Sequence, residues 1–273
     1  MNKEVEFERK HEEDLQRLRG LRLLDDDFMS KVFEDVKCAE FLLQILLNRD
    51  DLKVKKSTSQ YGIKNLQGWS VRLDILAVDD KNRVYNIEIQ RNDKGAGVKR
   101  ARYNSSIIDV NVTEPGDQYE KLNEVYVIFI TENDVMGKEL PIYHVERVIR
   151  ETGELFGNES HIVHIVYVNS QIRDDTALGK LMHDFSCTNA RDMYYEVLAK
   201  RVYYFKEDEK GVETMCRAME EMRNEAAREA ARETSLETAK SLLLIGKLTY
   251  EEIALATKLT VEEISELDRK KSA

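Results

Sequence analysis

Two acidic residues, Asp74 and Glu88, fall in consecutive segments whose alternation of apolar and polar side chains is typical of β-strands. The alternation runs over residues 71–77 and again over residues 85–89, and turn-forming residues fill positions 79–83 between them. If those positions form the loop of a hairpin, counting outward from it places Asp74 directly opposite Glu88. Directly opposed side chains have Cβ atoms about 5 Å apart, so two like charges there destabilise the hairpin unless something neutralises them.

A divalent cation held between the two carboxylates would neutralise them, and Mg²⁺ or Mn²⁺ suits a ligand set of carboxylate oxygens. Gln90 belongs to the same face as Asp74 and Glu88, because side chains on one face of a strand repeat every second residue. A one-residue slip of the register would move the two acids to opposite faces. The pattern therefore predicts a metal site, against the plainer interpretation of an exposed hairpin face that carries two acids.

The spacing D-x13-E-x-Q and the run Y-N-I-E-I-Q-R around Glu88 resemble the PD-(D/E)XK nuclease superfamily, in its branch of recombination-promoting nucleases and transposases. The resemblance implies that Asp74, Glu88 and the backbone carbonyl of Ile89 hold the metal ion. It implies Mg²⁺-dependent endonucleolytic cleavage of DNA, linked to recombination or mobile elements. Gln90 stands where the superfamily usually has lysine; an amide can position a water molecule or a phosphate oxygen but brings no charge.

The resemblance also implies an acidic residue upstream of the hairpin. Asp27 begins the run D-F-M-S-K, which matches the family's D-x-x-F-K element except for Ser30 in place of an aromatic residue. Asp27 is therefore a candidate catalytic acid, although an aspartate at this position is equally well explained as a helix N-cap. Glu40, at the start of the following apolar helix, is the alternative, and the sequence does not choose between them.

Positive charge gathers on both sides of the proposed metal site although the net charge of the chain is −10. Lys53, Lys55 and Lys56 precede the site, and a second cluster follows it within residues 91–102. These clusters could bind phosphate groups, or they could be ordinary solvated surface. The acidic net charge of the chain is not typical of a protein that binds nucleic acid. The R-x-R-Y element of the second cluster resembles a family element beside the site. The residues expected to contact DNA are Arg72, Arg91, Lys99, Arg100, Arg102 and Tyr103.

Several helices and strands must position these residues. Residues 1–20 form a charged lead-in, a helix starts near Asp26 or Asp27 and runs to Lys37, and an apolar helix spans residues 39–47. A further helix is expected over residues 98–110, followed by buried strands in V-Y-V-I-F-I and H-I-V-H-I-V-Y-V. Asp184 is expected at the surface or as a cap. The predicted fold class is α/β, with a restriction-endonuclease-like mixed sheet flanked by helices over residues 21–205.

Residues 206–273 form a helical tail. A charged helix over residues 211–234 has one narrow apolar stripe, which indicates a docking or dimer face and predicts a homodimer. The runs T-Y-E-E-I-A and T-V-E-E-I-S each place a threonine cap before a helix, in the manner of a helix-turn-helix. Because the second of these helices is acidic, contact with protein is favoured over contact with bases.

No run of 18 apolar residues or apolar signal segment occurs, and the three cysteines are scattered, so we expect a cytoplasmic protein that does not cross a membrane. A non-catalytic assembly protein that retains a nuclease core is the rival hypothesis, favoured by Gln90 and by the acidic net charge. Cleavage of RNA is a third, since the same site could perform it.

Overall fold

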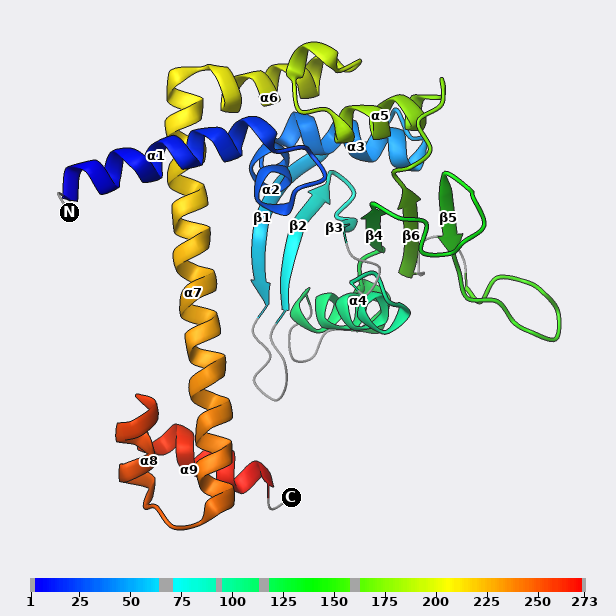
Figure 1. Ribbon diagram of the computed structural model, residues 1–273. Coiled ribbons are helices and arrows are strands. Elements are labelled where there is room, and N and C mark those ends of the chain that lie inside the picture. Colours follow the sequence, from blue (N-terminus) through cyan, green and yellow to red (C-terminus); the bar gives the residue numbers. More distant parts are fainter. Residues whose placement is uncertain (1–2, 64–70, 92–94, 113–117, 158–162, 272–273) are drawn as a thin grey trace. The chain divides into compact units, whose positions relative to one another are not determined.

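A computed structural model describes residues 3–63, 71–91, 95–112, 118–157 and 163–271 of the chain (Figure 1). In this part of the chain a mixed six-stranded sheet is flanked by helices, which confirms the predicted α/β class. The strand order is β1-β2-β3-β4-β6-β5. The strands are β1 (Val54–Ile63), β2 (Val71–Asp79), β3 (Val84–Gln90), β4 (Val125–Thr131), β5 (Ile142–Val145) and β6 (Val163–Asn169).

The helices fall before, within and after the sheet. They are α1 (Lys3–Gly20), α2 (Asp26–Phe33), α3 (Val36–Leu47), α4 (Val98–Val112), α5 (Ala177–Ser186), α6 (Glu196–Glu207), α7 (Glu209–Ile245), α8 (Tyr250–Thr257) and α9 (Val261–Lys271), with short 3₁₀ turns η1 (Tyr119–Lys121) and η3 (Ala190–Asp192). The expected helix ending at Lys37 is instead two helices. Asp35 interrupts it, because its carboxylate accepts hydrogen bonds from the backbone N–H groups of Lys37 (2.9 Å) and Cys38 (3.3 Å) and so caps a new helix.

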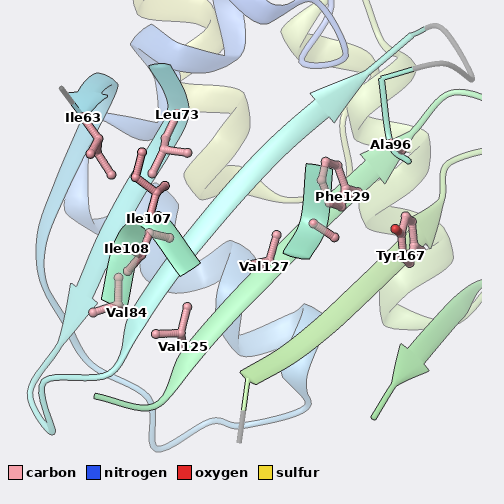
Figure 2. Close-up of a cluster of buried hydrophobic side chains, with 11 residues drawn as sticks. Ile63, Leu73, Val84, Ala96, Ile107, Ile108, Val125, Val127, Phe129 and Tyr167 are labelled. Carbon is pink, nitrogen blue, oxygen red and sulfur yellow. The ribbon is translucent and has the colours of Figure 1, made fainter. Parts of the chain in front are cut away.

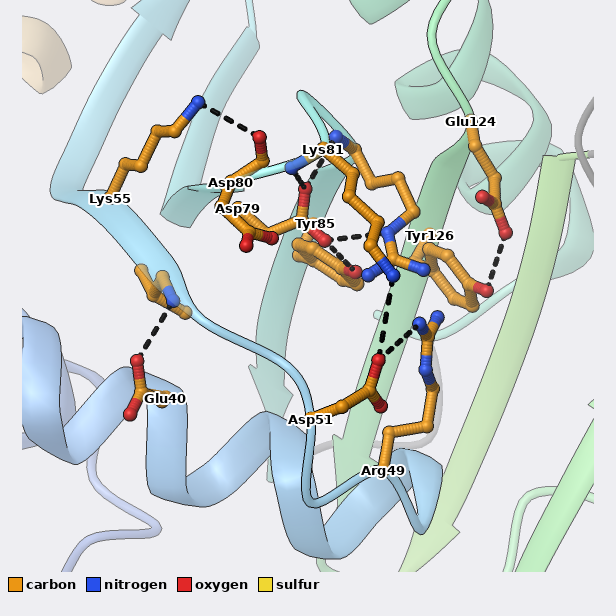
Figure 3. A network of polar contacts seen from close by, with 12 residues as sticks. Glu40, Arg49, Asp51, Lys55, Asp79, Asp80, Lys81, Tyr85, Glu124 and Tyr126 are labelled. Atoms are coloured by element: carbon orange, nitrogen blue, oxygen red, sulfur yellow. Dashed lines mark hydrogen bonds and ion pairs between the residues drawn. The ribbon is translucent and has the colours of Figure 1, made fainter.

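The antiparallel half of the sheet contains the predicted hairpin. Strands β2 and β3 pair with Leu76 opposite Asn86 and Val78 opposite Val84, which is the register that the sequence predicts. Asp79 fixes the end of the hairpin (Figure 3): its buried carboxylate accepts hydrogen bonds from the Arg83 backbone N–H (2.8 Å) and the Tyr85 hydroxyl (3.0 Å). Because a one-residue slip would break these contacts, Asp79 helps to hold the register on which the acidic pair depends.

The parallel half of the sheet continues through β3, β4 and β6, and helix α4 makes the crossover from β3 to β4. Every residue of β4 is buried, as expected for a central strand with both faces covered. Helix α4 contributes Ala101, Ile107 and Ile108 to a hydrophobic cluster with Val127 and Phe129 of β4 (Figure 2). This packing holds α4 against the sheet, so that its first turns lie beside the acidic end of β3.

Strands β1 and β5, at the two edges of the sheet, are absent from the sequence interpretation. Strand β1 pairs antiparallel with β2. Its sequence, V-K-K-S-T-S-Q-Y-G-I, is mostly polar and lacks the apolar alternation that predicts a strand. It begins opposite Asp79, at the turn end of the hairpin and several residues along the strand from Asp74. Lys55 there donates to the carbonyl of Asp80 (2.9 Å), so this lysine cluster belongs to the turn end of the sheet rather than to the acidic site.

The chain divides into two compact units, Met1–Cys216 and Arg217–Ala273. Met215, in the apolar stripe of α7, is fully buried, whereas Ala226 and Ala230 further along the stripe are exposed. In the second unit, Ala239 of α7 packs with Ile253 of α8 and Ile264 of α9. Reciprocal capping boxes begin α8 at Thr249 and α9 at Thr260. No helix among the described residues is both long enough and apolar enough to cross a membrane.

Candidate active site

The acidic pair lies where β2 and β3 diverge from regular pairing. The ladder pairs Ile75 with Ile87, and one step further its register places Asp74 opposite Glu88. The Asp74 backbone N–H donates to Oε1 of Glu88 (3.4 Å), and the Ile89 backbone N–H donates to Oδ2 of Asp74 (3.0 Å). These hydrogen bonds fix both carboxylates side by side in place of ordinary ladder bonds.

Glu88 is fully buried, and three side chains hold its carboxylate. Asn86 donates to Oε1 (2.8 Å), Asn104 of α4 approaches the same oxygen (3.5 Å), and Arg100 of α4 forms an ion pair with Oε2 (2.5 Å). Asn104 also donates to the side-chain oxygen of Asn86 (3.0 Å). A buried carboxylate with this many donors is stabilised in its charged form.

Asp74 has a less favourable environment for charge. Burial raises its pKa well above the ordinary value, and the negative charge of Glu88 raises it further. Burial also raises the pKa of Glu88, but the positive charge of Arg100 and the hydrogen bond from Asn86 oppose that shift. In the absence of a cation burial therefore opposes ionisation of both carboxyl groups, and only Glu88 has a cation, Arg100, in direct contact with it.

A third acid, Asp26, acts on this pair. Its charge raises the pKa values of both Asp74 and Glu88, and its own pKa is raised by burial and by the neighbouring Asp27. Asp26 lines a polar cavity of about 430 Å³ together with Ile89, Gln90, Arg91 and Glu132. The cavity therefore joins the first turn of α2 to the end of β3.

Neither of the two upstream acids that the sequence offers lines this cavity, although Asp27 lines a neighbouring one together with Asp26 and Arg91. Asp27 forms an ion pair with Arg17 of α1 (3.0 Å), and Glu40 accepts from the Val54 backbone N–H (3.0 Å) and pairs with Lys53 (3.1 Å). Glu40 is thus held at the start of β1, at the turn end of the hairpin. Asp26 was not predicted from the sequence. The three consecutive aspartates at positions 25–27 were nevertheless a signal, because consecutive residues at the start of a helix point their side chains in different directions.

Gln90 approaches the chain at Gly95 very closely. A Cβ atom built on Gly95 would lie 1.5 Å from Oε1 of Gln90, so a glycine leaves the space that this side chain occupies. The carbonyl of Gly95 also accepts a hydrogen bond from Arg100 (3.3 Å). Gln90 and Arg100 therefore meet at the same short segment, which places a positive charge near the position where the nuclease motif usually has lysine.

The remaining residues expected to contact DNA are spread over the surface. Arg91 pairs with Asp25 (2.8 Å) and with Glu132 (3.3 Å) beside the cavity, and it is half exposed. Arg72 at the start of β2 and Lys99, Arg102 and Tyr103 on α4 are exposed. Sequence reasoning missed Glu132 and Asn104; the latter could have been found, because it lies four residues after Arg100 and so on the same face of α4.

A mixed six-stranded sheet with flanking helices, which carries opposed acidic residues on one hairpin, defines a protein of restriction-endonuclease-like fold. The family model of PD-(D/E)XK nuclease family transposases matches residues 39–241, and the chain belongs to that family. No curated protein and no solved structure matches the chain.

Proposed function

We propose that the protein is a metal-dependent endonuclease that cleaves phosphodiester bonds of DNA in recombination or in the movement of mobile elements. The observation that carries the proposal is the pair of the fully buried Glu88 and the partly buried Asp74, fixed by directional hydrogen bonds beside a polar cavity. Membership of the nuclease-transposase family supports it. A purely structural acid pair has no reason to share its surroundings with a third acid, Asp26.

The acidic pair fits a hard divalent cation, Mg²⁺ or Mn²⁺. Two adjacent carboxylates with raised pKa values, one buried and one partly buried, lack the positive charge needed for both to ionise, and oxygen ligands are those that Mg²⁺ prefers. Asp74, Glu88 and the backbone carbonyl of Ile89 would hold the ion, with Asp26 available across the cavity. A cation bound there supplies Lewis-acid stabilisation of the phosphate and activation of water.

Arg100, Gln90 and the exposed basic residues have separate roles in this proposal. Arg100 keeps Glu88 ionised and ready to bind a cation, because a guanidinium favours the charged form of a neighbouring carboxylate. The Gln90 amide orients a phosphate oxygen or a water molecule at the cavity. Arg72, Arg91, Lys99, Arg102 and Tyr103 grip the DNA backbone, since guanidinium groups bind phosphate through two hydrogen bonds.

The direct test is incubation of the purified full-length protein with supercoiled plasmid in the presence of Mg²⁺, of Mn²⁺ or of EDTA. We expect nicked and linear DNA with either metal ion and none with EDTA. A parallel incubation with single-stranded and double-stranded RNA distinguishes a ribonuclease. A folded protein that cleaves none of these substrates would overturn the proposal in favour of the rival one, an assembly module built on a nuclease fold.

Substitution of Gln90 tests its place in the motif. We expect Gln90→Lys to preserve or raise Mg²⁺-dependent cleavage, because a cation near the scissile phosphate stabilises charge that develops there. We expect Gln90→Ala to lower the rate about tenfold, the loss of one hydrogen bond to a charged group. The measurement is the initial rate of plasmid nicking. Full activity of Gln90→Ala together with an inactive but folded Gln90→Lys would remove Gln90 from the mechanism.

We also propose that the protein is a homodimer through its C-terminal helices. Leu244 and Ile245 at the end of α7 and Leu255 of α8 are large apolar side chains that remain exposed. Two subunits related by a two-fold axis match the two strands of a duplex. We expect sedimentation to give a dimer, and Leu244→Glu/Leu255→Glu to give a monomer that nicks but does not linearise plasmid. Leu140→Glu, at an exposed leucine of the first unit, is the control; a monomeric full-length protein would refute the dimer.

A further inference from the structure

A histidine, an aspartate and a cysteine converge at the end of α5, away from the acidic pair. His183 and Asp184 belong to the last turn of α5, and Cys187 is its C-cap residue. One ligand atom from each residue lies within 4.8 Å of the other two. Among the described residues this is the one group of at least three histidine, cysteine and carboxylate ligands that is so close.

Two of the three distances within this cluster match those of a tetrahedral zinc site, and the third, from a carboxylate oxygen of Asp184 to Sγ of Cys187, is at most 4.8 Å. Nδ1 of His183 lies 3.4 Å from Oδ1 of Asp184 and 3.6 Å from Sγ of Cys187. With ordinary Zn–N, Zn–O and Zn–S bond lengths, tetrahedral angles require about 3.4 Å between nitrogen and oxygen and about 3.6 Å between nitrogen and sulfur. A cation can enter between the three atoms once side-chain rotation brings the Asp184 oxygen and the Cys187 sulfur to about 3.6 Å from each other.

The surroundings hold two of the three ligands in place. Asp184 is fully buried, contrary to the expectation of a surface position, and its two oxygens accept hydrogen bonds from the backbone N–H groups of Tyr194 (2.8 Å) and Tyr195 (2.9 Å). Each carboxylate oxygen has a second lone pair, so Oδ1 can still bind a metal ion. The ring of Tyr194 packs against the His183 ring, with centroids 4.8 Å apart, and limits its rotation. Hydrogen bonds of the kind that Asp184 accepts are typical of metal-ligating carboxylates.

We propose that His183, Asp184 and Cys187 form a binding site for Zn²⁺ or a similar borderline-soft transition metal ion, separate from the acidic site and with a fourth position open to solvent. A nitrogen, an oxygen and a sulfur ligand suit such an ion and do not suit Mg²⁺. The partly exposed side chain of His183 gives the ion a path of entry. Bound there, the ion ties the end of α5 to the segment that leads into α6.

Without a metal ion the cluster is held by hydrogen bonds. The one proton of the Cys187 thiol has two carbonyl acceptors within reach, those of His183 (3.4 Å) and Asp192 (3.8 Å). Burial, together with the charges of Asp184 and Asp192, raises the pKa of this thiol to about 11. A metal ion therefore has to displace the thiol proton when it binds.

Titration of metal-free full-length protein with Co²⁺ tests the site. A cobalt–thiolate charge-transfer band requires a cysteine ligand, so Co²⁺ at the acidic site contributes nothing to it. We expect the band in the wild type, its displacement by Zn²⁺, and one retained Zn²⁺ per chain. We expect Cys187→Ser to abolish the band, and His183→Gln to weaken Zn²⁺ binding by at least about 100-fold.

Three controls show whether the band comes from this cluster. Cys216→Ser removes a cysteine outside the cluster and should leave the band unchanged. Asp74→Asn should abolish DNA cleavage and also leave the band unchanged, so the two sites can fail independently. The circular dichroism spectrum checks that each variant is folded. Absence of a thiolate band in the wild type, or an unchanged band in folded Cys187→Ser, would overturn the proposal.

Discussion

Asp74→Asn is expected to reduce Mg²⁺-dependent plasmid nicking by at least about 100-fold, because loss of one carboxylate ligand removes several kcal/mol of charge stabilisation from the transition state. Glu88→Gln is expected to do the same. Asp74→Asn is the cleaner change, since its amide oxygen can still accept the Ile89 backbone N–H. In Glu88→Gln the new amide nitrogen faces Arg100 and breaks the ion pair as well.

The same substitution is expected to stabilise the metal-free protein above acidic pH. The pKa of Asp74 is raised in the folded state, so folding disfavours its ionised form, and the stability of the wild type falls as the pH rises above the ordinary pKa of an aspartate. Asparagine does not ionise and avoids this loss. Urea unfolding in EDTA at pH 4 and pH 8 should show a gain for Asp74→Asn only at the higher pH, and added Mg²⁺ should stabilise the wild type alone.

Asp26 and Asp27 form a matched pair of controls for the nuclease assay. They are neighbours in the sequence, but Asp26 lines the cavity and Asp27 pairs with Arg17. We therefore expect Asp26→Asn to slow cleavage and Asp27→Asn to leave it within a few-fold of the wild type. Wild-type nicking by Asp74→Asn and Glu88→Gln would remove the active site from the hairpin. If Asp27→Asn slows cleavage and Asp26→Asn does not, Asp27 is the upstream catalytic acid.

Arg100→Met is expected to destabilise the protein by about 2 kcal/mol at neutral pH, because it leaves the fully buried Glu88 charge without its cation. This destabilisation is smaller than that caused by removing one partner of a fully buried ion pair, because the Arg100 side chain is 37% exposed and partly screened by solvent. The loss should shrink as the pH falls, beginning above the ordinary pKa of a glutamate, because the pKa of Glu88 is raised in the folded state. We also expect Arg100→Met to lower the rate of cleavage, because Glu88 without its arginine is more readily protonated, and a protonated carboxyl group binds a cation poorly.

Urea unfolding of the wild type, Arg100→Met, the double variant Arg100→Met/Glu88→Gln and Arg102→Met measures what this ion pair contributes to stability. The double variant Arg100→Met/Glu88→Gln should recover most of the stability, because no buried charge remains unpaired. Arg102→Met changes an exposed arginine on the same helix and should stay within about 0.5 kcal/mol of the wild type. If Arg100→Met proves as stable as Arg102→Met, the ion pair does not hold Glu88 in its charged state.

The sequence determined those features that depend on local pattern. Alternation over a few residues identified β2 and β3, and the turn residues between them set the register in which Asp74 meets Glu88. The continuous apolar run of β4 indicated burial on both faces. These predictions succeeded because a strand's side-chain direction follows from its period alone. The family resemblance rested on the same residues and is confirmed over residues 39–241.

Only the tertiary structure decided which side chains from other elements surround the acidic pair. The sequence pattern did not predict strand β1, because a strand at the edge of a sheet does not need a run of apolar residues. Whether Asp26 or Asp27 lines the cavity beside Gln90 depends on how α2 packs, a rotation that residue type does not determine. Arg100 and Asn104 reach Glu88 because α4 packs on the sheet, and Asp184 is buried because a loop ten residues later donates its backbone N–H groups to it. Such contacts join segments far apart in the chain, and their partners are set by packing rather than by local sequence.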